Sequence, residues 1–276
     1  MSTFRKIRNN LFSEKAISAL GPRLYAGYLV NFLANIPNIL SAGDLRPLDR
    51  AMGKVARQFN YRGSRFSFDC EYCDEHLKED SYAFGIVREI YIRDCYFKWQ
   101  PPVVYDNART VIDLGANRGA FSALMTTRAN FILCVECGEQ YAQIIRHNML
   151  KNKFKSFLIE TALVGAGGLV AESKSPRYSL SGLLRRHNIE FADLVKIDIE
   201  GSEFALFEST DWLGRVGAIS MEVHPAYGDT EFVLQRLARH GFSYAVANED
   251  LRHTTDTKQV AFIYAWKNSQ ASKGVS

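Results

Sequence analysis

The stretch Val111-Ile-Asp-Leu-Gly-Ala-Asn-Arg-Gly119 decides the fold of this 276-residue chain. Its first residues are mostly apolar, as in a strand that is buried on both faces of a sheet. Gly115 and Gly119 allow the backbone to turn sharply and to approach a ligand closely. The residues that follow, 120–129, have the pattern of a helix. A strand, a glycine-rich turn and a helix in this order are typical of a nucleotide-binding α/β sheet.

Strands and helices continue to alternate up to residue 266. Apolar runs predict further strands at 131–136, 156–159, 194–199, 218–223, 242–247 and 259–266, with helices at 140–150 and 230–240. Such alternation produces βαβ units and a mostly parallel, doubly wound sheet. The last two predicted strands have no helix-length gap between them, so we expect an antiparallel strand in a hairpin at that edge.

The N-terminal region has a different composition. The first 50 residues contain seven basic and three acidic side chains, which accounts for the whole net charge of +4. Apolar residues between Leu24 and Ile36 are spaced for one face of a helix. We expect this helix to pack on the main domain, and a peripheral contact with an anionic membrane is the alternative. Residues 61–105 mix short alternating runs with an aromatic helical segment at 82–99 and a Pro-Pro break.

Several classes of protein are disfavoured by composition. No uninterrupted apolar run is long enough to cross a bilayer, and no small-residue cleavage site follows the late apolar stretch. Five cysteines, an odd number, fit a reducing cytoplasm better than a disulfide scaffold. The pairs Cys70/Cys73 and Cys134/Cys137 are too far apart in sequence for a compact zinc site. The small net charge does not indicate a nucleic-acid partner, and we expect none. The cysteines and the missing cleavage site together favour a cytoplasmic protein.

A carboxylate at the end of the second strand indicates a nucleoside ligand. Glu136 follows Gly115 by 21 residues, where it can accept hydrogen bonds from both hydroxyls of a ribose. Dinucleotide sites use Gly-x-Gly-x-x-Gly, which is absent here, and no Walker lysine follows. Asp113 at the first strand would repel a pyrophosphate but attract a cation such as an amino acid ammonium. The pattern therefore favours S-adenosylmethionine over a nicotinamide dinucleotide.

Two further motifs, at 193–203 and 220–225, each lie at the end of a predicted strand. In the first motif, Lys196 and Asp198 point to the same face of the strand. A lysine buried in a sheet needs an acidic partner, which Asp198 or Glu222 could supply. Glu200 and Glu203 lie just beyond. In the second, His224 follows the next strand. It is either a strand-end histidine that caps the loop or a base, because neutral imidazole suits removal of a hydroxyl proton.

The order of these motifs resembles the FkbM-type methyltransferases over about residues 108–266. The resemblance rests on Asp113-Leu-Gly-Ala-Asn-Arg-Gly119, Val135-Glu136, Lys196-Ile-Asp-Ile-Glu-Gly-Ser-Glu203 and Met221-Glu-Val-His224. It implies a class I, Rossmann-like, seven-stranded sheet whose last hairpin contains the antiparallel strand. It also implies cofactor contacts from Asp113, Gly115, Asn117, Gly119 and Glu136. The sequence departs from the family at Cys137-Gly138, where members often have a proline.

These observations predict an α/β protein of three parts: an N-terminal helical extension at 1–107 that recognises the substrate, a methyltransferase domain at 108–268, and a flexible tail at 269–276. The expected activity is S-adenosylmethionine-dependent O-methylation of a hydroxyl on a sugar, polysaccharide or glycolipid precursor. Small molecules such as polyketides are the alternative acceptors, and a non-catalytic cofactor-binding protein that docks on a membrane or partner is the rival class. The expected catalytic residues are His224, Asp198, Glu200 and Lys196, and Ala162 and Asp198 complete the cofactor site.

A divalent metal is a further alternative at the catalytic residues. Two carboxylates and an imidazole, from Asp198, Glu200 and His224, would suit Mg²⁺ or Mn²⁺. The family that this region resembles does not clearly require a metal. From the sequence alone we therefore assign none.

Overall fold

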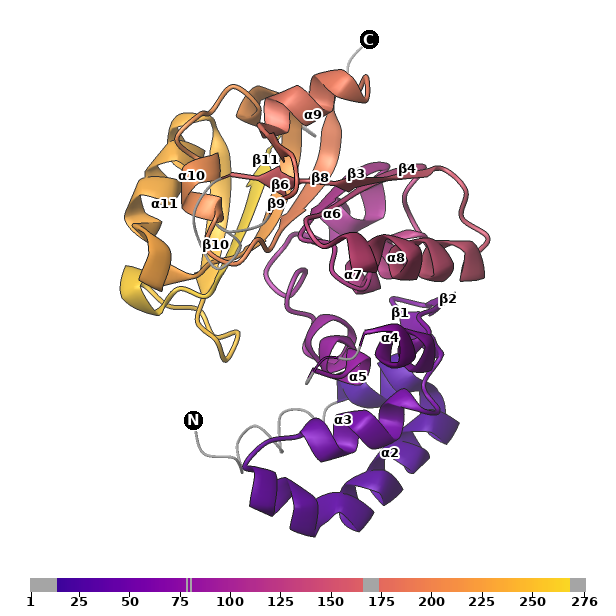
Figure 1. Ribbon diagram of the computed structural model, residues 1–276. Coiled ribbons are helices and arrows are strands. Elements are labelled where there is room, and N and C mark those ends of the chain that lie inside the picture. The colour runs from indigo at the N-terminus through magenta and orange to yellow at the C-terminus, as the bar shows by residue number, and fades with distance from the viewer. Residues whose placement is uncertain (1–13, 78, 80, 166–173, 269–276) are drawn as a thin grey trace. The chain divides into compact units, whose positions relative to one another are not determined.

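The computed structural model describes residues 14–77, 79, 81–165 and 174–268 (Figure 1). The chain divides into two compact units. Unit 1 contains Met1–Cys95, Arg118–Thr127 and Gln143–Lys155, and unit 2 contains Tyr96–Asn117, Arg128–Ala142 and Ser156–Ser276. The chain first passes between the units after Cys95, earlier than the functional boundary expected after residue 107. The expected tail at 269–276 lies outside the described residues.

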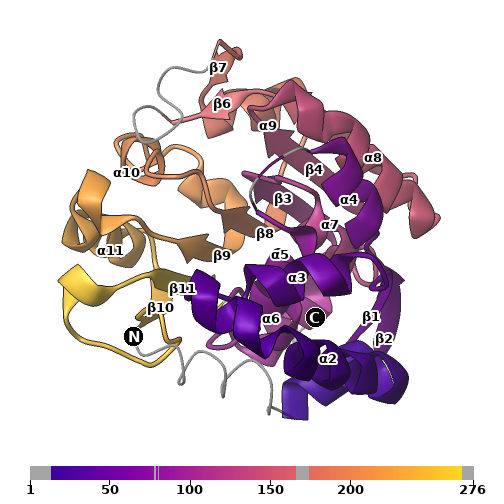
Figure 2. The same cartoon turned by 60° about the horizontal axis from the view of Figure 1, so that its bottom comes forward.

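Unit 2 is built on a seven-stranded sheet with the order β10-β11-β9-β8-β3-β4-β5. Figure 2 shows β9, β8, β3 and β4 side by side at its centre. Its strands are β3 (Thr110–Leu114), β4 (Phe131–Glu136), β5 (Phe157–Thr161), β8 (Ala192–Ile197), β9 (Val216–Glu222), β10 (Phe242–Ala247) and β11 (Phe262–Lys267). Within this sheet β11 runs antiparallel to both of its neighbours, and the other pairs are parallel. The predicted Rossmann-like sheet with an antiparallel hairpin strand is confirmed.

The central strands of this sheet are buried on both faces. On β8, Leu194, Val195 and Ile197 have no exposed surface, although they point alternately to the two sides. This explains why the sequence shows a continuous apolar run and not a two-residue alternation. The helices of unit 2 are α6 (Pro102–Asn107), α9 (Leu180–Arg186), α10 (Glu203–Leu206) and α11 (Thr230–Arg239), together with the 3₁₀ turns Leu213–Arg215, Pro225–Tyr227 and Thr257–Gln259.

Short segments complete unit 2. The strands β6 (Leu163–Val164) and β7 (Arg177–Tyr178) form a small parallel pair that the sequence patterns did not indicate. Asp229 caps the N-terminus of α11, and its side chain accepts a hydrogen bond from the amide of Glu231.

Unit 1 is mainly helical, with one hairpin. It comprises α2 (Glu14–Ala42), α3 (Arg46–Gly53), β1 (Gln58–Tyr61), β2 (Ser64–Ser67), α4 (Cys70–His76), α5 (Ala83–Val87), the π-helix η1 (Arg88–Ile92), α7 (Ala120–Met125) and most of α8 (Glu139–Lys151). The expected N-terminal helix is present as α2, with a kink at Gly21. Of its apolar face, Tyr28 is buried and Leu33 is 64% exposed.

Polar side chains join the separate stretches of unit 1. The side chain of Asn148 accepts a hydrogen bond from the amide of Asp69 at 2.9 Å and donates one to the carbonyl of Arg118 at 3.0 Å. Arg88 forms two hydrogen bonds of 2.6 Å with the buried carboxylate of Asp49. The contacts of Asn148 tie the stretches 118–127 and 143–155 to the N-terminal residues, and the Arg88–Asp49 pair lies within the N-terminal stretch. Among the described residues, no helix has the length and apolar character needed to span a membrane.

Candidate functional site

The turn after β3 passes against the end of β8 in unit 2. Gly115 has a φ of 72°, and a Cβ at this position would lie 1.6 Å from the carbonyl oxygen of Asp198. The amides of Gly115 and Ala116 both donate to the carbonyl of Val135, at 2.9 and 3.0 Å. A side chain at 115 therefore has no room, and the glycine that the sequence singled out is required by close backbone packing.

Glu136 organises the neighbouring loops through its carboxylate. The side chain is 8% exposed and accepts hydrogen bonds from the amides of Asn117 (2.8 Å) and Gly138 (2.9 Å). The amide of Ala162 donates to the Glu136 carbonyl at 3.0 Å. The structure thus brings together Asn117, Glu136 and Ala162, as expected for one site. Gly138 in the atypical Cys-Gly pair supplies one of the two amides that hold this carboxylate.

Gly119 has a packing function in unit 1. Its φ is 76°, it precedes the first residue of α7, and a Cβ there would lie 3.3 Å from the Cα of Ile145. Close approach of α7 and α8 within unit 1 therefore accounts for this glycine. Its expected contact with a cofactor stays a prediction.

Lys196 is buried in the sheet of unit 2, where Asp113 lies beside it in register on β3. Its ammonium lies 3.2 Å from Asp113 and 3.6 Å from Asp198, and it donates to the carbonyl of Gly115 at 2.6 Å. Burial alone would lower the pKa of Lys196, but the charges of Asp113 and Asp198 outweigh it and raise the pKa. The expected partner Asp198 is confirmed, and Asp113 is a closer one that the sequence analysis missed.

These contacts show how the two side chains are held. Asp113 has no exposed surface, and its carboxylate faces Lys196, so its expected contact with a cofactor stays a prediction. Lys196 donates to the backbone carbonyls of Leu114 and Gly115, and its expected catalytic role also stays a prediction. Lys196 thereby holds the turn at Gly115 against β8.

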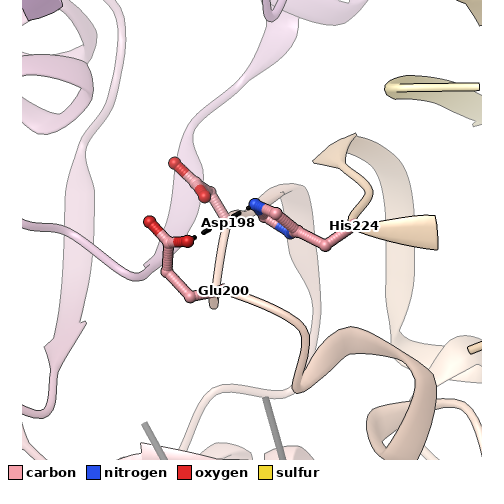
Figure 3. A group of neighbouring side chains, drawn as sticks. All are labelled: Asp198, Glu200 and His224. Atoms are coloured by element: carbon pink, nitrogen blue, oxygen red, sulfur yellow. Dashed lines mark ion pairs between the residues drawn. The ribbon is translucent and has the colours of Figure 1, made fainter. Parts of the chain in front are cut away.

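Three side chains from the ends of β8 and β9 converge on one point (Figure 3). Asp198, Glu200 and His224 each place one nitrogen or oxygen atom within 4.8 Å of the others. The Nε2 atom of His224 lies 3.5 Å from a carboxylate oxygen of Glu200. Asp198 also accepts a hydrogen bond of 2.9 Å from the hydroxyl of Tyr96, a residue that no sequence motif indicated. The three residues expected from two separate motifs therefore form one group.

Glu203 supports the group of Asp198, Glu200 and His224 through hydrogen bonds. Its carboxylate has no exposed surface and accepts hydrogen bonds from Nδ1 of His224 (3.0 Å), the His224 amide (2.7 Å) and the Gly201 amide (2.9 Å). The hydrogen bond to Glu203 raises the pKa of His224 to about 9, against the opposing effect of burial. This contact favours the imidazolium form of His224, and the expected role of His224 as a base stays a prediction.

The site carries an excess of negative charge. Four carboxylates, from Asp113, Asp198, Glu200 and Glu203, surround two cations, Lys196 and His224. Burial and the nearby charge of Asp198 raise the pKa of Glu200, as expected when acidic groups are crowded. The arrangement is suited to a ligand that carries positive charge.

Comparison of the sequence with known families gives one match. Residues 102–244 match the family described as the methyltransferase FkbM domain, which is 143 of the 276 residues. The chain belongs to this family. This FkbM-family protein is accordingly an S-adenosylmethionine-dependent methyltransferase, and the predicted family, enzyme class and cofactor are confirmed.

Similar solved structures are distant in sequence. The METTL16 MTase domain is 14% identical, covers 80% of each chain and has a TM-score of 0.45. Precorrin-6y C5,15-methyltransferase from Geobacter metallireducens GS-15 is 17% identical over 60% of this chain and 87% of that chain, with a TM-score of 0.40. An rRNA methylase from Streptococcus thermophilus is 11% identical over 60% and 90%, with a TM-score of 0.42. No curated protein sequence matches the chain.

The side chains of the FkbM-family site fit S-adenosylmethionine. Its ribose hydroxyls suit the carboxylate of Glu136, which retains lone pairs beyond the two used by backbone amides. Its sulfonium and ammonium charges suit the acidic surroundings of Asp198. Ligands of open α/β sheets bind at the carboxyl edge of the strands. The expected cofactor contacts stay a prediction for the residues at this edge: Gly115, Asn117, Glu136, Ala162 and Asp198.

Proposed function

We propose that this FkbM-family protein methylates a hydroxyl group, and that the acceptor is a sugar or a polysaccharide or glycolipid precursor. The observation that carries the proposal is the convergence of Asp198, Glu200 and His224 at the carboxyl edge of the sheet. Two carboxylates that accept and an imidazolium that donates can hold a hydroxyl in a defined orientation. Their number and charge suit a ligand rich in hydroxyl groups.

The chemistry follows from positioning. S-adenosylmethionine supplies an electrophilic methyl group when it is bound. Glu136 would fix the ribose end, and the Asp198 group would place the acceptor oxygen in line with the methyl carbon, which is the main source of rate enhancement in such displacements. The C–O bond forms as the C–S bond breaks, and the electron pair of that bond stays on sulfur. Of the two expected proton acceptors, His224 has a raised pKa because it donates a hydrogen bond to Glu203, so we propose Asp198 as the acceptor.

The activity is tested with the full chain and methyl-labelled S-adenosylmethionine. Candidate acceptors are soluble sugars, polysaccharides, glycolipid extracts, a macrolide and RNA. We expect alkali-stable labelling of a glycan acceptor and equimolar release of S-adenosylhomocysteine. Labelling of the macrolide or of RNA alone would contradict the proposed acceptor class. Cofactor binding without transfer to any of these acceptors would favour a non-catalytic role.

Replacement of Glu136 with alanine should weaken binding of S-adenosylhomocysteine by at least tenfold. Each charge-assisted hydrogen bond to a ribose hydroxyl is worth about 1.5–3 kcal/mol. Isothermal titration calorimetry of the variant measures the effect. Glu139→Gln is the control, because Glu139 is an exposed carboxylate close in sequence. Equal affinities in the two variants would remove Glu136 from the cofactor site.

A further inference from the structure

We propose that Asp198, Glu200 and His224 bind a divalent cation, Mg²⁺ or Mn²⁺, to which the acceptor hydroxyl is bound. The proposal rests on the proposed function, because it names how that site would hold its acceptor. It also replaces the expectation, drawn from sequence alone, that no metal is used. Of the residues that the structure describes, these three form the group whose spacing suits a metal ion.

The orientation of His224 is the first argument. Its Nδ1 atom faces the carboxylate of Glu203 at 3.0 Å, and a carboxylate can only accept, so Nδ1 carries a proton. The Nε2 atom faces Glu200 and is the ring nitrogen that would bind a metal ion, with displacement of the proton it carries in the imidazolium form. A histidine that donates its other ring nitrogen to a carboxylate is the usual arrangement of metal-binding histidines. Glu203 would therefore be a positioning residue and not a ligand.

The hydrogen bonds that Glu203 makes with the segments carrying this group are the second argument. Glu203 also accepts hydrogen bonds from the amide of His224 and from the amide of Gly201, the residue after Glu200. One fully buried carboxylate thus ties together the two segments that carry Glu200 and His224. Glu200 itself has a φ of 53°, in the left-handed region. These contacts hold two of the three ligands in place before any ion arrives.

The chemistry of the ligand set is the third argument. Two carboxylate oxygens with one imidazole are suited to Mg²⁺ and Mn²⁺, whereas structural zinc sites are dominated by cysteine and histidine. Three ligands from the protein leave coordination positions for water and for the acceptor oxygen. The surrounding excess of carboxylates over cations would also be reduced by a divalent ion.

A cation at this point would change the fate of the acceptor proton. A hydroxyl bound to a divalent ion loses its proton more readily than a free hydroxyl. With the ion bound, Asp198 and His224 serve as ligands, and the proton passes to water. This removes the need for a neutral side-chain base beside the acceptor.

Metal binding is tested on the full chain by calorimetry with Mg²⁺ and by electron paramagnetic resonance with Mn²⁺. We expect one Mn²⁺ per chain and at least tenfold weaker binding in Asp198→Asn, Glu200→Gln and His224→Ala. The side chain of Glu200 is 51% exposed, so Glu200→Gln should retain the fold. Glu208→Gln, which changes an exposed carboxylate outside the group, is the control and should bind Mn²⁺ as the parent does.

Glu203→Gln tests the positioning role. It should weaken Mn²⁺ binding by about 10–100-fold, as the loss of a partner of a metal-binding histidine does. The far-ultraviolet circular dichroism of this variant shows whether it folds. If Glu203→Gln is unfolded, the Glu200→Gln result alone decides the proposal.

Three outcomes would overturn the metal site. These are the absence of stoichiometric Mn²⁺ binding, equal Mn²⁺ affinity in Glu200→Gln and Glu208→Gln, and competitive displacement of Mn²⁺ by S-adenosylhomocysteine. The last would mean that these carboxylates serve the cofactor ammonium. The binding experiments need no acceptor. Methyl transfer to a hydroxyl that persists in EDTA would overturn the metal site and leave the proposed function standing. Binding of Mn²⁺ without methyl transfer to any hydroxyl would support the metal site and overturn the proposed function.

Discussion

Gly115→Ala should abolish binding of S-adenosylhomocysteine and lower the free energy of unfolding by about 3 kcal/mol or more. The new Cβ would lie 1.6 Å from the carbonyl oxygen of Asp198, and because this neighbour is backbone it cannot move aside as a flexible side chain would. The φ of 72° adds a strain of about 1–2 kcal/mol for any residue with a side chain. Relief of the overlap would separate the turn after β3 from the end of β8, where the site residues lie.

The matched control is Gly241→Ala. Gly241 also has a positive φ, of 77°, but no heavy atom lies within 4 Å of the position of its Cβ. The free energy of unfolding of Gly241→Ala should fall only by the strain of about 1–2 kcal/mol, and its cofactor affinity should equal that of the parent. Urea unfolding and calorimetry of both variants make the comparison. Equal losses of stability would show that the turn does not depend on its approach to Asp198.

Lys196→Met should lower the free energy of unfolding by about 3–5 kcal/mol, the usual cost of removing one partner of a buried ion pair. The carboxylate of Asp113 has no exposed surface and would lose the ammonium that lies 3.2 Å away. The carbonyl of Gly115 would lose a donor at 2.6 Å. Because that carbonyl belongs to the turn, cofactor affinity should fall together with stability.

A second substitution separates charge from packing. Asp113→Asn combined with Lys196→Met removes the uncompensated charge, so the double variant should be more stable than Lys196→Met alone. Lys258→Met, which changes an exposed lysine of the same unit, should leave the free energy of unfolding within about 0.5 kcal/mol of the parent. If Lys196→Met behaves like Lys258→Met, the buried ion pair contributes nothing to folding.

Features that depend on neighbouring residues could be predicted from the sequence. Strands buried on both faces appear as apolar runs, which predicted the strands of the sheet. The short gap between the last two runs predicted the antiparallel strand of the hairpin. Gly115 could be identified because a glycine between a strand and a helix has few other uses. The helix expected at 120–129 is shorter, Ala120–Met125, because element ends depend on contacts that the pattern does not contain.

The sequence by itself determined the fold class and the residues at the strand ends, because periodicity and glycine spacing are properties of neighbouring residues. The family followed from the resemblance of its motifs. Only the tertiary structure decided how those residues are paired. The register of β3 against β8 places Asp113 beside Lys196, and the fold brings Glu203 under His224 from 21 residues away. These pairings shift the pKa values of the groups: the hydrogen bond to the fully buried carboxylate of Glu203 raises the pKa of His224. Such contacts join distant residues, and no local pattern specifies them.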